Sequence, residues 1–243
     1  MRKLIYLLLG LVVATSAVGR AADENRNTVI TEKPDLEKIK AETTDPKSRF
    51  YYPRLMERYE RNETIMGLED YRYLYLGTMF QEDYNPYRTS EFRDKNRELY
   101  YKENLSRPEL DSIIAYAELS LEDDPFDLEQ MSYLIYALRQ RDKKNRANVW
   151  QYRLNHVLLA IISTGTGLDE ENAWFVINPR HEYNIANFLG RAVESEEFIE
   201  PYYEYIKLAP VADLQSKSPD GYYFNIRQML EEYYRKYPEE LSN

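Results

Sequence analysis

The sequence predicts an α+β protein that is mainly helical, with a helical stack followed by a small antiparallel β-sheet and a C-terminal helix. Apolar residues recur at helical spacing through residues 34–164. Aromatic and β-branched runs separated by turn-forming residues then follow within residues 165–243. A chain of 243 residues, 43% of them hydrophobic, is long enough to bury a full core. We therefore expect the sheet and terminal helix to pack on the helical part.

The amino terminus has the pattern of a secretory signal peptide. Basic Arg2 and Lys3 precede an apolar core, and small residues follow up to Ala22. We expect cleavage after Ala21, with Gly19 as the alternative position, and a flexible polar leader over residues 22–33. A membrane anchor is the competing interpretation, but the apolar run is about 15 residues where roughly 20 are needed to span a bilayer. The sequence thus predicts export to the periplasm or the extracellular space, with no membrane insertion after cleavage.

Composition narrows the classes of partner. The chain has no cysteine, which excludes disulfides and the cysteine-linked lipid anchor of a lipoprotein. Removal of residues 1–21 takes away three of the 32 basic residues and none of the 42 acidic ones, so 29 against 42 leaves a net charge of −13. A strongly acidic protein is a poor partner for nucleic acid or anionic membranes. We expect a protein, peptide or glycan partner instead.

The first helices are delimited by proline. Pro34 opens a short helix that Asp45-Pro46 ends, and Pro53 begins a second helix that runs to about Asn62. A third helix starts at Leu68 and carries tyrosines on its apolar stripe. We expect a loop over residues 81–87, a further helix over 91–103, and then a capping box, in which Ser106 and Glu109 satisfy free backbone donors.

Residues 106–164 read as consecutive helices separated by short turns. Asp124-Pro125 ends one helix, Asp127 begins the next, and a third starts near Asn145. This layout is similar to a tetratricopeptide-like α-hairpin stack, with Pro125 at the place of the helix-closing proline. No second copy occurs at a 34-residue spacing, and an autonomous array needs about three repeats. A helical layer packed on another element is therefore favoured over a solenoid.

The second part begins where Gly165 and Gly167 are expected to end the long helix. Val176-Ile177 suits an edge strand, and we expect a helix over residues 181–189 that Gly190 ends. Three short strands and a closing amphipathic helix should follow. The strands are centred on Phe198-Ile199, Tyr202 to Leu208 and Tyr222 to Ile226, and the helix carries Met229, Leu230, Tyr233 and Tyr237.

Candidate site residues gather around one of the two histidines. His181, Glu182 and Tyr183, together with Tyr84 and Tyr87, are our candidate ligand-binding residues. His181 could also be a structural histidine that caps backbone groups, or a general base oriented by its neighbour, although adjacent helical residues seldom face one cavity. We assign no catalytic residue.

Other kinds of site lack their patterns. Gly165-Thr166-Gly167 follows a helix rather than a strand, unlike a nucleotide-binding loop, and no Gly-x-Ser-x-Gly elbow is present. His156 and His181 have no metal-ligand spacing, although Asp169, Glu170 and Glu171 could add ligands. We predict no metal site and no cofactor.

The chain has 24 tyrosines and only 8 phenylalanines. A tyrosine buries a large ring and keeps a hydroxyl that needs a partner, so it suits a thin core or an aromatic groove for sugar or peptide.

Several short motifs, in order along residues 34–227, resemble the bacterial domain of unknown function numbered 4919. They are Tyr52-Pro53-Arg54-Leu55-Met56-Glu57-Arg58, Phe80-Gln81-Glu82-Asp83-Tyr84-Asn85-Pro86-Tyr87, Asp124-Pro125-Phe126-Asp127-Leu128, Val176-Ile177 with His181-Glu182-Tyr183, and Tyr223-Phe224-Asn225-Ile226. The resemblance implies a secreted or periplasmic bacterial protein and carries no assigned activity, cofactor or catalytic residue.

Two functions stay open at this point. The first is a non-catalytic exported binding protein that uses a tyrosine-rich surface. The alternative is a glycan- or peptide-directed hydrolase with a site near His181.

Overall fold

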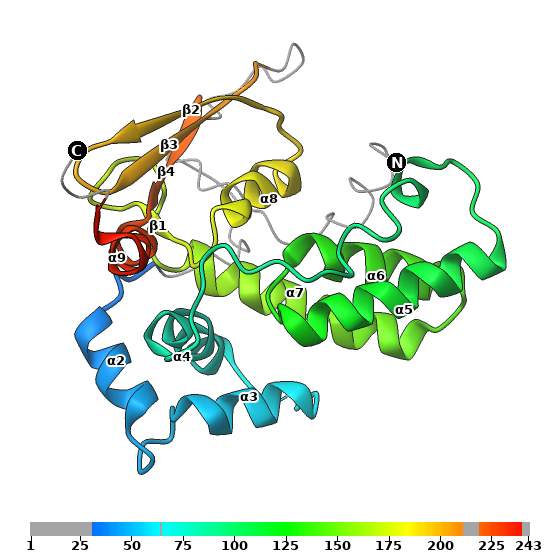
Figure 1. Ribbon diagram of the computed structural model, residues 1–243, viewed down its shortest axis with the longest axis horizontal. Coiled ribbons are helices and arrows are strands. Elements are labelled where there is room, and N and C mark those ends of the chain that lie inside the picture. The colour runs from blue at the N-terminus through cyan, green and yellow to red at the C-terminus, as the bar shows by residue number, and fades with distance from the viewer. Residues whose placement is uncertain (1–30, 64, 211–218, 240–243) are drawn as a thin grey trace, which may run out of the picture.

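The computed structural model describes residues 31–63, 65–210 and 219–239 (Figure 1). The predicted signal peptide and most of the predicted leader lie outside these residues. Within the described ranges, no helix has the length and apolar character needed to cross a membrane.

Three short helices begin the described chain: α2 (Leu36–Thr44), α3 (Tyr52–Glu60) and α4 (Leu68–Gly77), the last extended by the 3₁₀ turn η1 (Thr78–Phe80). The side chain of Asp35 caps α2, and the helix ends before Asp45-Pro46 as the sequence predicts. Gly77 lets α4 approach α2 closely, since a Cβ there would lie 2.6 Å from Cγ2 of Thr43. Tyr71 and Tyr75 of α4 are buried in the core.

The predicted helix over residues 91–103 was wrong. This segment consists of turns followed by the 3₁₀ turn η2 (Leu99–Tyr101). Its side chains are anchored elsewhere: Arg93 Nε donates to Asp127 Oδ2 at 2.8 Å, and Asn96 Nδ2 donates to the Ser112 carbonyl at 2.8 Å. These tertiary contacts outweigh the weak helical preference of a polar segment.

The longer helices α5 (Arg107–Asp123), α6 (Leu128–Gln140) and α7 (Lys144–Ile162) lie side by side in chain order (Figure 1). The capping box is present, because Glu109 Oε2 accepts from the backbone N–H of Ser106 at 2.8 Å. Asp127 caps α6 by accepting from the N–H groups of Glu129 and Gln130. The mainly helical α+β class is confirmed, whereas the tetratricopeptide-like character stays a prediction.

The sheet has the strand order β1-β4-β3-β2. Its strands are β1 (Trp174–Phe175), β2 (Val193–Ile199), β3 (Tyr203–Leu208) and β4 (Gly221–Asn225). The three strands predicted to form an antiparallel sheet do so as β2, β3 and β4, and β1 joins β4 in parallel, so the whole sheet is mixed. The predicted edge strand at Val176-Ile177 lies two residues earlier, at β1. The backbone of Ile177 instead bonds tyrosine hydroxyls: its N–H donates to Tyr75 at 3.2 Å and its carbonyl accepts from Tyr84 at 2.8 Å.

Gly165 and Gly167 do not end α7, which stops at Ile162 with Ser163 as its C-cap. They lie in the following loop, which wraps around Trp174. Trp174 Nε1 donates to the Gly165 carbonyl at 3.0 Å, and a Cβ on Gly165 would lie 2.1 Å from the Asn172 carbonyl oxygen. The glycines therefore provide close approach rather than a helix cap.

The helix predicted over 181–189 is α8 (Arg180–Phe188), and the closing helix is α9 (Arg227–Lys236). In Figure 1, α8 lies between the sheet and helices α6 and α7, and it contacts α6 and β3. One continuous cluster of buried apolar side chains extends from Ile39 in α2 to Met229 in α9. The sheet and the helices thus share one core, and α8 is placed at their junction.

Candidate functional site

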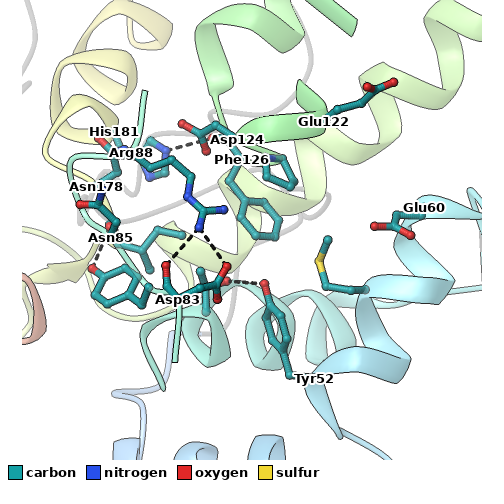
Figure 2. A pocket seen from close by; sticks show the side chains of 15 residues that line it. Tyr52, Glu60, Asp83, Asn85, Arg88, Glu122, Asp124, Phe126, Asn178 and His181 are labelled. Carbon is teal, nitrogen blue, oxygen red and sulfur yellow. Dashed lines mark hydrogen bonds and ion pairs between the residues drawn. The ribbon is translucent and has the colours of Figure 1, made fainter. Parts of the chain in front are cut away.

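A cavity of about 250 Å³ lies beside the first turn of α8 (Figure 2). Its walls come from α3, the loop after η1, the turn between α5 and α6, and the chain entering α8. Carboxylates and aromatic rings line it together with one arginine: Glu60, Asp83, Glu122, Asp124, Tyr52, Tyr84, Phe126 and Arg88. We call this cavity the α8 pocket. Two of the predicted site residues, His181 and Tyr84, line it.

His181 forms part of the pocket wall with both ring nitrogens engaged. Nε2 lies 3.0 Å from the Phe126 carbonyl, and Nδ1 lies 2.7 Å from the hydroxyl of Tyr75. Because a carbonyl only accepts, Nε2 carries the proton and Nδ1 accepts from the phenol. Burial lowers the pKa of His181 to about 4. His181 is therefore neutral at pH 7 and satisfies backbone and phenol groups.

Tyr75 and Tyr84 fix the chain that leads into α8. Tyr75 donates to His181 and accepts from the N–H of Ile177, whereas Tyr84 donates to the carbonyl of Ile177. Tyr75 thus uses its hydroxyl both as donor and as acceptor, and Tyr84 uses its hydroxyl as a donor. The ring of Tyr84 also lines the α8 pocket.

Asp124 is a buried carboxyl of the pocket whose pKa is shifted by its surroundings. Burial, with the nearby charge of Asp127, raises the pKa of Asp124 to about 6, although Arg180 opposes the shift. Arg180 Nη2 lies 2.9 Å from Asp124 Oδ2, which joins the α5–α6 turn to α8. Across the pocket, Arg88 pairs with Asp83 at 2.9 Å, as Figure 2 shows.

Sequence reasoning missed Asp124, Arg88 and Arg180. Asp124 was interpreted only as part of a helix-ending turn. The Asp124–Arg180 pair joins positions 56 residues apart. Local periodicity carries no signal for such a pair, and the burial of Asp124 is visible only in the structure.

Glu182 is directed away from the pocket, toward the sheet. It is completely buried, and neither carboxylate oxygen has a hydrogen-bond partner of good geometry among the described residues. Burial, followed by the charge of Glu204 on β3, raises the pKa of Glu182 well above its usual value. Burial also raises the pKa of Glu204. The side chains of Glu182 and Glu204 interact, so the protonation of one depends on that of the other.

Tyr183 and Tyr87 are the remaining predicted site residues, and both are exposed. Tyr183 donates a hydrogen bond to Glu196 of β2. The ring of Tyr87 packs against that of Tyr233 in α9, with centroids 6.2 Å apart. The five candidates thus fall into two groups: His181 and Tyr84 at the α8 pocket, and Glu182, Tyr183 and Tyr87 outside it.

In the described ranges, no group of three or more His, Cys, Asp or Glu side chains is placed to hold a metal ion.

The fold defines a mainly helical α+β protein with a polar, aromatic-lined pocket beside the first turn of α8. The family model described as "Domain of unknown function (DUF4919)" matches residues 37–235, and the chain belongs to this family. No curated protein and no solved structure matches the chain significantly.

Proposed function

We propose that this protein is an exported, non-catalytic binding protein whose α8 pocket receives a polar group of a protein, peptide or glycan partner. The observation that carries the proposal is the composition of the pocket around His181. Carboxylates and aromatic rings line a cavity of about 250 Å³, whereas the histidine has no free ring nitrogen. A cavity of this size suits one sugar ring or one amino-acid side chain rather than an extended ligand.

The lining residues supply the contacts that such a group needs. Aromatic rings such as Tyr52 and Phe126 offer apolar faces for a sugar ring or a side-chain stem. Glu60 and Glu122 have no ion-pair partner among the described residues, so they can accept hydrogen bonds from hydroxyl or amide groups. Orientation of the ligand would come from these acceptors, and affinity from the rings.

Binding is tested by calorimetric titration of the mature protein with oligosaccharides and short peptides. A ligand present at 100 times its Kd adds about 2.7 kcal/mol to the free energy of unfolding, so a thermal-shift screen can precede the titration. Tyr52→Ala should weaken binding, whereas Tyr101→Ala, which removes a ring that is 73% exposed elsewhere, should leave it unchanged. Equal affinity in both variants would place the ligand outside the pocket.

Export is tested by the mass of the protein recovered from the periplasm or medium of a bacterial host. The expected chain starts at Ala22. Replacement of Leu7 and Leu8 by arginine interrupts the apolar core of the signal peptide and should retain the protein in the cytoplasm. Recovery of an exported chain that still begins at Met1 would contradict cleavage after Ala21.

A second candidate is a glycan- or peptide-directed hydrolase with its site near His181, and the state of Asp124 favours it. A buried carboxyl with a pKa of about 6 is suited to donate a proton near neutral pH. Product analysis by mass spectrometry after incubation with oligosaccharides and peptides tests this activity. Asp124→Asn should abolish turnover and Glu122→Gln should not. If the wild-type protein turns over none of these substrates, the hydrolase candidate is rejected and the binding function is retained.

A further inference from the structure

A second face of α8 carries an unusual group of acids. Glu182 of α8, Glu196 of β2 and Glu204 of β3 approach one another where the helix covers the sheet. Among the described residues, none of the three forms an ion pair with lysine or arginine. Glu182 is completely buried, and among the described residues neither of its oxygens has a hydrogen-bond partner other than the Glu204 carboxyl. Burying carboxylates without compensating donors is costly, so this group calls for a donor or a positive charge.

Strand register shows which side chains share this face. Phe198 lies opposite Glu204, and Glu196 lies opposite Ile206. Directly paired residues project to the same side of a sheet, and Ile206 is buried in the core beneath α8. Glu196, Phe198 and Glu204 therefore all project toward α8.

Aromatic rings surround the acids at the surface. Tyr183 is 40% exposed and its hydroxyl donates to Glu196, while Phe198 is 51% exposed beside Glu204. Tyr87 is 53% exposed. Burial is the main cause that raises the pKa of its phenol, and the nearby charges of Glu204 and Glu182 raise this pKa further. We call these six residues, Glu182, Glu196, Glu204, Tyr87, Tyr183 and Phe198, the acidic–aromatic face.

We propose that the acidic–aromatic face binds a primary alkylammonium group. Glu204 is only partly buried and Glu196 is exposed, so these two carboxylates would contact the ligand, with Glu182 behind Glu204 as a positioning residue. An ammonium supplies three N–H donors and a positive charge, which are what the group lacks. Aromatic faces attract cations, and they pack on the alkyl stem.

The same observations disfavour other cations. A quaternary ammonium has no N–H to donate, so it would leave the carboxylate oxygens unpartnered. The described residues contain no group of acids placed around a metal ion. A primary ammonium, from a free amine or from a lysine side chain of a peptide, fits both requirements.

Binding should be linked to protons. In the free protein Glu182 and Glu204 hold a proton between them, with Glu196, Tyr183 and Tyr87 as the other titratable groups facing them. An ammonium beside Glu204 favours the ionised pair, so the shared proton leaves as the ligand enters. Affinity should therefore increase as the pH rises toward the raised pKa of the pair.

The test is calorimetric titration of the mature protein with n-butylammonium and with the peptide acetyl-Gly-Lys-Gly-amide, in two buffers of different ionisation enthalpy. We expect saturable binding with proton release. Tetramethylammonium should bind at least about tenfold more weakly, because lost charge-assisted hydrogen bonds cost at least that factor. Binding of n-butylammonium alone identifies a free-amine site, and binding of the peptide identifies a lysine site; either supports the ammonium chemistry.

Matched variants locate the site. Glu204→Gln should weaken binding about tenfold, whereas Glu197→Gln, in the same region but opposite Tyr205 on the other face of the sheet, should change it less than about twofold. If Glu204→Gln lowers the melting temperature strongly, Glu196→Gln replaces it as the test. Tyr52→Ala in the α8 pocket should have no effect, which separates this proposal from the pocket function. Absence of saturable binding, equal affinity for tetramethylammonium, or wild-type affinity in both folded acid variants would overturn the proposal.

Discussion

The phenol of Tyr75 donates a 2.7 Å hydrogen bond to Nδ1 of His181 and so connects α4 to α8 across 106 positions of the chain. The same oxygen accepts from the N–H of Ile177, and the other nitrogen of His181 donates to the carbonyl of Phe126. A continuous buried chain of hydrogen bonds therefore ties the helices to the segment that enters α8.

Removal of one hydroxyl tests this chain of bonds. Tyr75→Phe leaves the N–H of Ile177 and Nδ1 of His181 without partners, so we expect a loss of about 2 to 4 kcal/mol in the free energy of unfolding. Urea denaturation measures it. Tyr101→Phe makes the same chemical change on an exposed ring and should cost less than about 0.5 kcal/mol. Equal effects of the two substitutions would contradict the buried network.

The titration of His181 should limit stability in acid. The folded-state pKa is lowered to about 4, so below pH 6.5 the unfolded chain takes up a proton that the folded chain resists. This contribution to stability, about 3 kcal/mol, is present at neutral pH and is lost as the pH falls from about 6.5 to 4. NMR titration of the imidazole, assigned with a His156→Gln variant, should show no midpoint above about pH 5. A midpoint near 6.5 would be inconsistent with the engaged, buried ring.

Glu182 should have the opposite dependence on pH. Its folded-state pKa is raised, first by burial and then by Glu204, so the folded chain holds a proton that the unfolded chain has released. The stability that protonated Glu182 adds to the folded chain is present below about pH 4.5 and is lost as the pH rises toward its folded-state pKa. Glu182→Gln keeps the shape of the side chain without its charge. It should therefore raise the midpoint of urea denaturation at pH 8 and weaken the dependence of that midpoint on pH above pH 5. Glu197→Gln serves as the control, and a lower midpoint for Glu182→Gln at pH 8 would refute the account.

The loop around Trp174 depends on the absence of a side chain at Gly165. A Cβ at that position would lie 2.1 Å from the Asn172 carbonyl oxygen, so Gly165→Ala must displace backbone and should cost more than about 2 kcal/mol. A Cβ at Gly67 meets nothing within 4 Å, so Gly67→Ala should cost at most about 1 kcal/mol, the value of a helix N-cap change. Thermal unfolding of the two variants gives the comparison, and similar melting temperatures would show that the loop is not tightly packed there.

Features that depend on residues close in the chain were predicted well. The break at Asp45-Pro46, the capping box of Ser106 and Glu109, and the helix that contains His181 all follow from spacings of a few residues, and the structure has each of them. The ligand-binding role of the candidate residues stays a prediction, and the structure shows only where they lie. His181 and Tyr84 do meet at one pocket, but Glu182 faces the sheet because neighbouring residues on a helix are about a quarter-turn apart.

By itself, the sequence determined the mainly helical α+β class and the position of most helices, because periodicity, caps and proline breaks act locally. Membership in the family of unknown function rests instead on the match of the family model over residues 37–235. Only the tertiary structure decided that residues 91–103 form turns, that β1 runs parallel to β4, and that Asp124 pairs with Arg180 while Glu182 meets Glu204. Each of these depends on groups far apart in the chain, whose burial and charge are set only when the sheet closes over α8.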